Sequence, residues 1–226
     1  MYSFCINNQF NLITIPKIGC TQTIKYISEY MGIFDEHEHS YTTNYCKIHR
    51  TIHKCGKKYF KYNPKLPTYL ITRPIHDRIL SYYKSKYKLL INYGNPTFKS
   101  FIDNLNIYYN HDKHHLSMIK DIIKKKNIKI NYLLNLDKLE FNLNNLFNKY
   151  DINFKTEKKY IINSTSTNET CENKKEIIKN YNLKRSDIKL PIVNSTMFNK
   201  EIINKIELFY KKDLEYYISN SSEYFS

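Results

Sequence analysis

Apolar residues along the chain follow two patterns, short continuous runs and longer stretches with helical spacing. Three runs rich in β-branched and aromatic residues are typical of buried strands, and they occupy residues 10–17, 68–72 and 128–135. Each run precedes a stretch with helical spacing, at residues 21–32, 75–90 and 139–150. Strands that alternate with helices predict an α/β fold with a central, mostly parallel sheet flanked by helices.

The end of the sequence predicts one more helix, at residues 200–218, with its apolar residues on or near one face: Ile202, Ile206, Phe209 and Leu214. The polar stretch 163–175 ("NSTSTNETCENKK") predicts a surface loop. At 226 residues the chain has the length of one ordinary domain, and it contains no internal repeat.

Composition narrows the class of protein. A hydrophobic share of 41% and an aromatic share of 15% argue against intrinsic disorder. The net charge of +15 favours a polyanionic partner: nucleic acid, anionic polysaccharide, anionic lipid or a phosphate-rich cofactor. No stretch has the pattern of a signal peptide or the apolar length of a membrane span, which predicts a soluble chain, cytoplasmic by default. Five scattered cysteines argue against a disulfide framework, although a single Cys46–Cys55 bridge stays open.

The first strand-to-helix junction, "IPKIGCTQTIK" at residues 15–25, has the chemistry of an anion site. It combines Lys17 and hydroxyl side chains with the backbone N–H groups of a helix N-terminus. Gly19 allows the backbone to approach an anion closely. The Walker pattern of P-loop kinases is missing, because the lysine precedes the glycine. The alternative interpretation is an ordinary turn with a solvated lysine.

The second junction, "LITRPIHDRILSYYKSKY", begins where Arg73 follows a predicted strand. Pro74 suits the first turn of a helix. Arg73 and Ser81, two turns further on, are able to reach one phosphate, the arginine with a bidentate grip. Arg78 is interpreted as part of a solvated helix face, whereas Tyr82 and Tyr83 are interpreted as core residues.

These two motifs, in this order, resemble the cofactor loops of sulfotransferases that use 3′-phosphoadenosine 5′-phosphosulfate (PAPS). "IPKIGCTQTIK" is similar to the 5′-phosphosulfate loop, and "LITRPIHDRILSYYKSKY" is similar to the 3′-phosphate motif (V/L)RxPxxRxxSxY. The similarity is greatest to the carbohydrate-type branch, which includes chondroitin, dermatan and uronyl 2-O-sulfotransferases. Weaker similarities extend it over residues 12–217, in "HDKHHLSM", "NYLLNLDKL", "VNST" and "FYKKDLEYY".

The resemblance implies a P-loop-like three-layer fold, built as a single sulfotransferase domain over residues 1–226. It implies an enzyme that transfers a sulfuryl group from PAPS to a hydroxyl acceptor and releases adenosine 3′,5′-bisphosphate. The acceptor that it favours is a carbohydrate, including an anionic glycan. The implied cofactor-binding residues are Lys17, Gly19, Cys20, Thr21, Gln22, Thr23, Arg73 and Ser81. Gln22 departs from the serine that is common in the family, and the acidic residue often found before the proline is missing at Pro74.

The stretch "CKIHRTIHKC" has the composition of a zinc site, but its spacing disfavours one. A helix would turn Cys55 away from the other three side chains, and an extended strand would turn Cys46 away. Neither geometry collects a tetrahedral set of ligands, so no metal is predicted. Members of the carbohydrate branch carry a histidine between the two cofactor motifs, which makes His49, followed by Thr51, the expected catalytic base.

Other candidates for the base are His53 and Glu29, whereas His114 and His115 are expected to be structural or to face the acceptor. Lys17 is the second expected catalytic residue, because its charge would stabilise the departing 5′-phosphate. A nucleic-acid-binding protein without catalysis is the alternative, suggested by the charge and by lysines interleaved with tyrosines in "YYKSKYK". No recognised nucleic-acid motif appears, so no nucleic-acid partner is expected.

Overall fold

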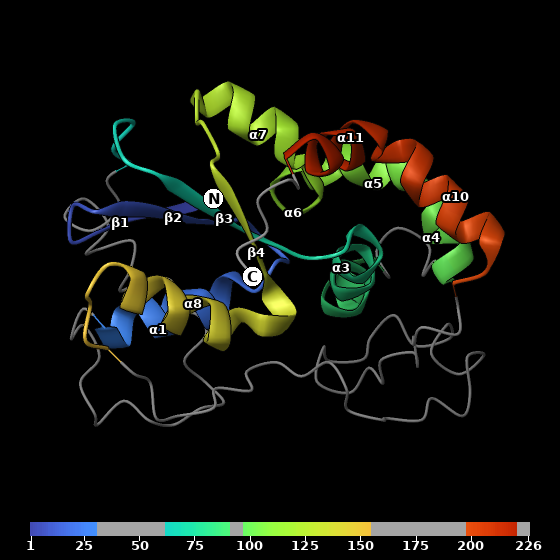
Figure 1. Ribbon diagram of the computed structural model, residues 1–226. Coiled ribbons are helices and arrows are strands. Elements are labelled where there is room, and N and C mark those ends of the chain that lie inside the picture. Colours follow the sequence, from blue (N-terminus) through green and yellow to red (C-terminus); the bar gives the residue numbers. More distant parts are fainter. Residues whose placement is uncertain (31–61, 91–96, 155–197, 221–226) are drawn as a thin grey trace. The chain divides into compact units, whose positions relative to one another are not determined.

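The computed structural model describes residues 1–30, 62–90, 97–154 and 198–220 (Figure 1). These residues form two compact units. The first contains residues 1–30, 62–73, 119–154 and 215–220, and the second contains residues 74–90, 97–118 and 198–214. The chain therefore leaves the first unit and returns to it, and both units are discontinuous in sequence.

The first unit is an α/β structure around an open, mixed sheet of four strands in the order β1-β2-β3-β4. The strands are β1 (Tyr2–Ile6), β2 (Phe10–Thr14), β3 (Thr68–Thr72) and β4 (Tyr132–Asn135). β1 pairs antiparallel with β2, whereas β2, β3 and β4 run parallel. The α/β class and the parallel pairing are as predicted from the sequence, and β1 is an addition.

The hairpin between β1 and β2 turns on two asparagines. Asn7 and Asn8 have φ angles of 47° and 55°, in the left-handed region that asparagine tolerates better than most residues. The N–H group of Gln9 closes the turn by donating to the carbonyl oxygen of Ile6 at 2.8 Å. This turn sets the register in which Ile6 faces Phe10.

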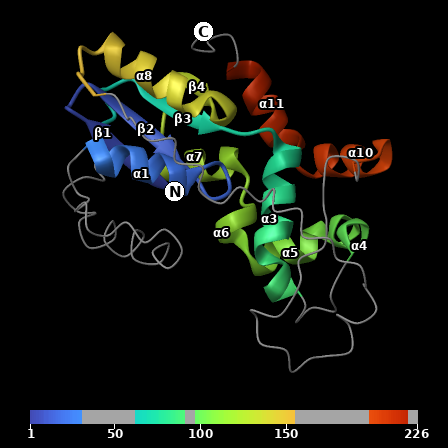
Figure 2. The same ribbon diagram turned by 90° about the horizontal axis from the view of Figure 1, so that it is seen from below.

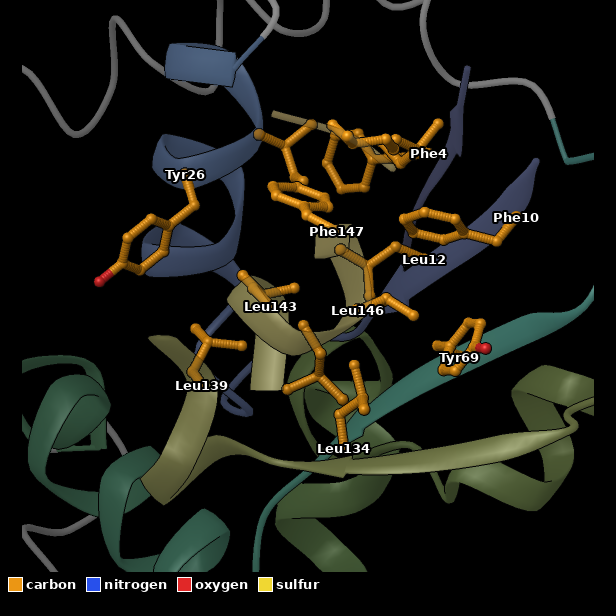
Figure 3. Close-up of a cluster of buried hydrophobic side chains, with 14 of the residues drawn as sticks. Phe4, Phe10, Leu12, Tyr26, Tyr69, Leu134, Leu139, Leu143, Leu146 and Phe147 are labelled. Atoms are coloured by element: carbon orange, nitrogen blue, oxygen red, sulfur yellow. The ribbon is translucent and has the colours of Figure 1, made fainter. Parts of the chain in front are cut away.

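Helices cover both faces of this sheet. α1 (Cys20–Tyr30) and α8 (Leu139–Lys149) lie side by side on one face (Figures 1 and 2). Between them and the strands lies a buried cluster, shown in Figure 3, that includes Phe4, Phe10, Leu12, Tyr69, Leu134, Leu143, Leu146 and Phe147. α7 (Ile119–Lys126) covers the opposite face with Ile119 and Ile123, which pack with Ile13, Leu70 and Leu133.

The second unit is helical. Its elements are α3 (Ile75–Leu90), α4 (Phe98–Asp103), α5 (Leu105–His111), α6 (Lys113–Leu116) and α10 (Lys200–Phe209). They enclose a cluster of buried apolar side chains that includes Tyr82, Tyr83, Phe98, Phe101, Ile202 and Ile206. The interpretation of Tyr82 and Tyr83 as core residues is confirmed.

The helix predicted at 200–218 is two helices, α10 and α11 (Lys211–Asn220), separated at Tyr210. Ile202 and Ile206 are buried, and Phe209 and Leu214 are partly buried against the same cluster, so the predicted apolar face is correct. The interruption coincides with a buried Tyr210, whose hydroxyl donates to the carbonyl oxygen of Leu116 at 2.9 Å.

The interpretation of Arg78 as a solvated residue is wrong. Its side chain is 1% exposed. Nη2 donates to the carbonyl oxygens of Ser117 at 2.6 Å and His115 at 3.1 Å, and Nη1 lies 3.9 Å from the buried carboxylate of Asp213. Those carbonyl groups lie in the last turn of the short helix α6 and at its C-cap, where carbonyl oxygens need donors, which explains why an arginine on α3 is directed inward.

Candidate functional site

The carboxyl ends of β2, β3 and β4 meet at one edge of the sheet, because these strands are parallel. Each strand is followed there by a short connection. The first two are the loops of residues 15–19 and 73–74, and the third loop is a single turn of 3₁₀ helix, η3 (Leu136–Lys138). Open parallel sheets bind ligands at this edge. The side chains in these three loops therefore form the candidate site.

The first loop is bent by two residues with positive φ, Lys17 at 68° and Gly19 at 74°. Glycine adopts this conformation without penalty, but for a lysine it costs on the order of 1 kcal/mol. Ile15 and Ile18 on either side of Lys17 are fully buried and fix the loop to the core. Strain of this kind persists where the surrounding structure enforces it, and it is concentrated at functional sites.

Gly19 joins the first loop to the third. A Cβ atom built on Gly19 would lie 2.1 Å from Cδ1 of Leu136, so no larger residue fits without displacing that side chain. The glycine was expected for its close approach to an anion, and the structure gives it a packing role against Leu136. The carbonyl oxygen of Gly19 accepts the N–H and the hydroxyl of Thr23, at 2.9 Å and 3.0 Å, at the start of α1.

Arg73 joins the second loop to the first. Its guanidinium Nη1 donates to the carbonyl oxygen of Lys17 at 3.5 Å. Just before it, the hydroxyl of Thr72 donates to the carbonyl oxygen of Leu134 on β4 at 3.1 Å. The Arg73 guanidinium and the Lys17 backbone are therefore brought together at one edge, as the order of the two motifs suggested.

The remaining residues of the first motif lie in the first turns of α1. Cys20 and Gln22 are half-buried, and Cys20 carries a free thiol. Thr23 is fully buried, and its hydroxyl proton is directed at the Gly19 carbonyl. Thr21 belongs to the same turn and contributes its backbone N–H to the helix N-terminus.

The other expected site residues are Ser81, His49 and Glu29. Ser81 belongs to the second unit, where it is half-buried in α3. His49 lies outside the described residues, as do His53 and the two cysteines of the same stretch. Glu29, the other candidate base, is half-buried near the end of α1.

The third loop adds acidic chemistry that the sequence analysis did not assign to the site. Asp137 is exposed, and its N–H donates to the side chain of Asn135 at 2.9 Å. In the first turn of α8, the carboxylate of Glu140 accepts the hydroxyl of Tyr26 at 3.4 Å. Burial and the charge of Glu140 raise the pKa of Tyr26 above its ordinary value, so this tyrosine is a neutral donor.

His115 is held by an acidic neighbour within the second unit. Its Nδ1 lies 2.8 Å and 2.9 Å from the two carboxylate oxygens of Asp112. Burial opposes ionisation of Asp112, but hydrogen bonds and charge from His115 outweigh burial and hold the pKa of Asp112 below its ordinary value. Asp112 also caps α6 by accepting the N–H of His115, which gives the pair a structural role.

Two further expectations concern metals and membranes. In residues 1–30, 62–90, 97–154 and 198–220, no three His, Cys, Asp or Glu side chains gather as a set of metal ligands. None of the helices in these ranges is both long and apolar enough to cross a bilayer. Comparisons with protein-family models, curated proteins and solved structures found no match.

Proposed function

We propose that this protein is a PAPS-dependent sulfotransferase with a P-loop-like fold, acting on a hydroxyl group of a carbohydrate. The observation that carries the proposal is the contact between the Arg73 guanidinium and the carbonyl oxygen of Lys17. It links two cationic residues from neighbouring strand exits, in the order of the two cofactor motifs. A nucleotide with a phosphate at each end requires two such groups on adjacent loops.

The strained backbone of Lys17 adds support. A left-handed lysine between two buried isoleucines is a costly arrangement that an ordinary turn would avoid. The backbone N–H groups in the first turn of α1 follow this loop directly, and a helix N-terminus favours the binding of a negative charge. Thr23 is the weakest candidate among the residues expected to bind the 5′-phosphate. Its hydroxyl would have to break its hydrogen bond to the Gly19 carbonyl oxygen before it could donate to a phosphate.

In the proposed reaction, PAPS supplies the sulfuryl group. The acceptor oxygen forms a bond to sulfur while the bond from sulfur to the 5′-phosphate oxygen breaks. Lys17 and the N–H groups of residues 19–22 stabilise the charge that develops on the departing phosphate. Arg73 holds the 3′-phosphate and positions the nucleotide. His49 accepts the proton of the acceptor hydroxyl.

Nucleotide binding is tested first, by thermal unfolding with adenosine 3′,5′-bisphosphate. At a ligand concentration of about 100 times Kd the stabilisation is about 2.7 kcal/mol, which raises Tm by roughly 5–10 °C for a chain of this size. Adenosine 5′-monophosphate is the matched ligand, because it lacks only the 3′-phosphate. Lys17→Ala and Arg73→Ala should reduce the shift, whereas Lys65→Ala, an exposed lysine at the other edge of the sheet, should not.

Sulfate transfer is tested next, with radiolabelled PAPS and a panel of glycans. Lys17→Ala and His49→Ala should each lower turnover by about two to four orders of magnitude. A His49→Ala variant with full activity would remove His49 from the role of base. Equal Tm shifts with the bisphosphate and the monophosphate would contradict the 3′-phosphate site. Salt-sensitive RNA binding without any bisphosphate shift would favour the nucleic-acid alternative.

A further inference from the structure

A second surface lies at the opposite edge of the same sheet, where β3 and β4 begin. The chain segments that precede these strands are bonded to each other. The N–H group of Lys129 donates to the Tyr62 hydroxyl at 3.2 Å, and the N–H group of Asn131 donates to the Thr68 carbonyl oxygen at 2.9 Å. In return, the Thr68 N–H donates to the side-chain oxygen of Asn131 at 2.9 Å.

The segment before β3 is further fixed by the buried side chain of Asn11. Its Nδ2 donates to the carbonyl oxygens of Asn63 at 2.7 Å and Leu66 at 3.3 Å, and its Oδ1 accepts the N–H of Asn63 at 2.9 Å. Asn11 is fully buried on β2, so the sheet itself holds this segment. The shape of the surface is therefore part of the folded structure.

The two segments enclose a pocket of about 300 Å³, lined by Pro64, Lys65, Leu66, Pro67, Lys129 and Asn131. Lysines continue from the pocket along α7. We use the name lysine surface for the exposed residues Lys65, Lys120, Lys124, Lys125, Lys126 and Lys129. Asp121 is the single carboxylate within residues 62–67 and 119–131. Within the described chain, Lys124, Lys125, Lys126 and Lys129 form no ion pair, whereas Lys99 and Lys205 do.

We propose that the lysine surface binds a linear anionic polysaccharide. Lysines on flexible stems adapt to carboxylate and sulfate groups spaced along a chain. A pocket of this volume is at the small end of ligand sites, a scale that suits one charged sugar unit. A lysine-rich stretch such as "KKKNIK" is also typical of surfaces that bind heparin-like polymers.

Nucleic acid and an anionic membrane fit this surface less well than an anionic polysaccharide. Proteins that bind single-stranded nucleic acid stack bases on aromatic rings or on arginine. The described pocket lining contains neither, and the nearby Tyr62 is half-buried with its hydroxyl bonded to Lys129. An anionic membrane would favour an apolar anchor among the lysines, but the large exposed apolar residues of the described chain, Ile107, Phe141 and Leu208, belong to other helices.

This inference goes beyond the proposed transferase activity and does not depend on it. The pocket lies at the amino ends of β3 and β4, and the Lys17–Arg73 contact lies at the carboxyl ends. A five-residue strand separates the two edges by roughly 16 Å, so one nucleotide does not fill both.

The test measures affinity for heparin and for chondroitin sulfate over a range of salt concentrations. The test variant removes three positive charges of the lysine surface: Lys124→Gln, Lys125→Gln and Lys129→Gln. A control variant removes three exposed lysines of the second unit: Lys113→Gln, Lys200→Gln and Lys212→Gln. The two variants have the same net charge, so they separate a local surface from a general effect of charge.

We expect the test variant to bind heparin about 10- to 100-fold more weakly at low salt, and the slope of log Kd against log salt to fall by about two. The control variant should stay within about twofold of the parent. Equal losses in both variants would overturn the proposal. The affinities for single-stranded RNA and for anionic vesicles are measured in the same way. The proposal would also be overturned if the parent bound either of these more tightly than heparin and the test variant bound that ligand as much more weakly as it binds heparin.

Two measurements keep the result interpretable. The urea midpoint of the test variant should match that of the parent, because the three lysines are exposed. Its Tm shift with adenosine 3′,5′-bisphosphate should also match, because the nucleotide loops lie at the other edge. If the test variant loses heparin binding but keeps its Tm shift with the bisphosphate, the result supports the lysine surface as a site separate from the nucleotide loops. If it keeps heparin binding but loses the Tm shift, the result contradicts the lysine surface as the heparin site.

Discussion

Replacing Gly19 with alanine tests the geometry of the loop between β2 and α1. Alanine adds one methyl group at a residue with φ of 74°, and that Cβ would lie 2.1 Å from Cδ1 of Leu136. The left-handed conformation costs roughly 1 kcal/mol for alanine. Displacing a packed leucine side chain costs about 1–3 kcal/mol more. The expected loss of unfolding free energy is therefore about 2–4 kcal/mol.

A loss of about 3 kcal/mol lowers Tm by roughly 6–12 °C for a chain of this size, which calorimetry or circular dichroism detects readily. The two contributions separate in a double-mutant cycle with Leu136→Ala. Removing the leucine side chain eliminates the steric conflict but leaves the backbone strain. The double variant should therefore be about 1–3 kcal/mol more stable than the sum of the single losses.

The cycle also gives the result that would refute the reasoning. Strict additivity, within about 0.5 kcal/mol, would mean that Gly19 and Leu136 do not touch. The first and third loops would then not share an edge in the way described, and the candidate site would lose one of the two contacts that hold it together. A Gly19→Ala variant of unchanged stability would have the same meaning.

Three further predictions concern single residues of the two units. Lys17→Gly removes the backbone strain that a lysine has at positive φ, so the urea midpoint should be unchanged or slightly higher. The same change should abolish the Tm shift with adenosine 3′,5′-bisphosphate, and a lower urea midpoint would contradict the strain at Lys17. Arg78→Met removes the cation that lies 3.9 Å from the buried carboxylate of Asp213 and should cost about 3–5 kcal/mol in urea unfolding, with partial recovery on adding Asp213→Leu. The lowered pKa of Asp112 means that its stabilising contribution is present above its ordinary pKa near 4 and is lost as pH falls below it. His115→Ala should therefore flatten the fall of the urea midpoint between about pH 5 and pH 3.

The sequence predicts the elements that are delimited by local signals. The strand Thr68–Thr72 and the helix Ile75–Leu90 have the predicted bounds, because a continuous apolar run is enclosed by Pro67 and Pro74. β1 was not predicted, since five residues with one polar position give little periodicity. The strand predicted from residue 128 begins only at Tyr132. Ile128 and Ile130 are buried, but burial alone does not give a residue the backbone hydrogen bonds to a neighbouring strand that define a β-strand.

Short helices and distant contacts account for most of the remainder. α4, α5, α6 and α7 have between four and eight residues, too few for a helical period to stand out. The contact of Gly19 with Leu136 and the ion pair of Arg78 with Asp213 join residues far apart in the sequence. No local pattern carries that information. The junctions at Lys17 and Arg73 were recognisable because strand, loop and helix signals are consecutive there.

The core of the second unit draws its side chains from two distant stretches of the chain, and this has a consequence for biosynthesis. Phe98 and Phe101 share one buried cluster with Ile202, Ile206 and Tyr210. A ribosome adds about 5–20 residues per second, so the stretch ending at residue 118 waits roughly 4–16 s for residue 198 to be made. During that interval the cluster lacks the apolar side chains of α10, so we expect newly made chains to be a substrate for chaperones that bind apolar segments.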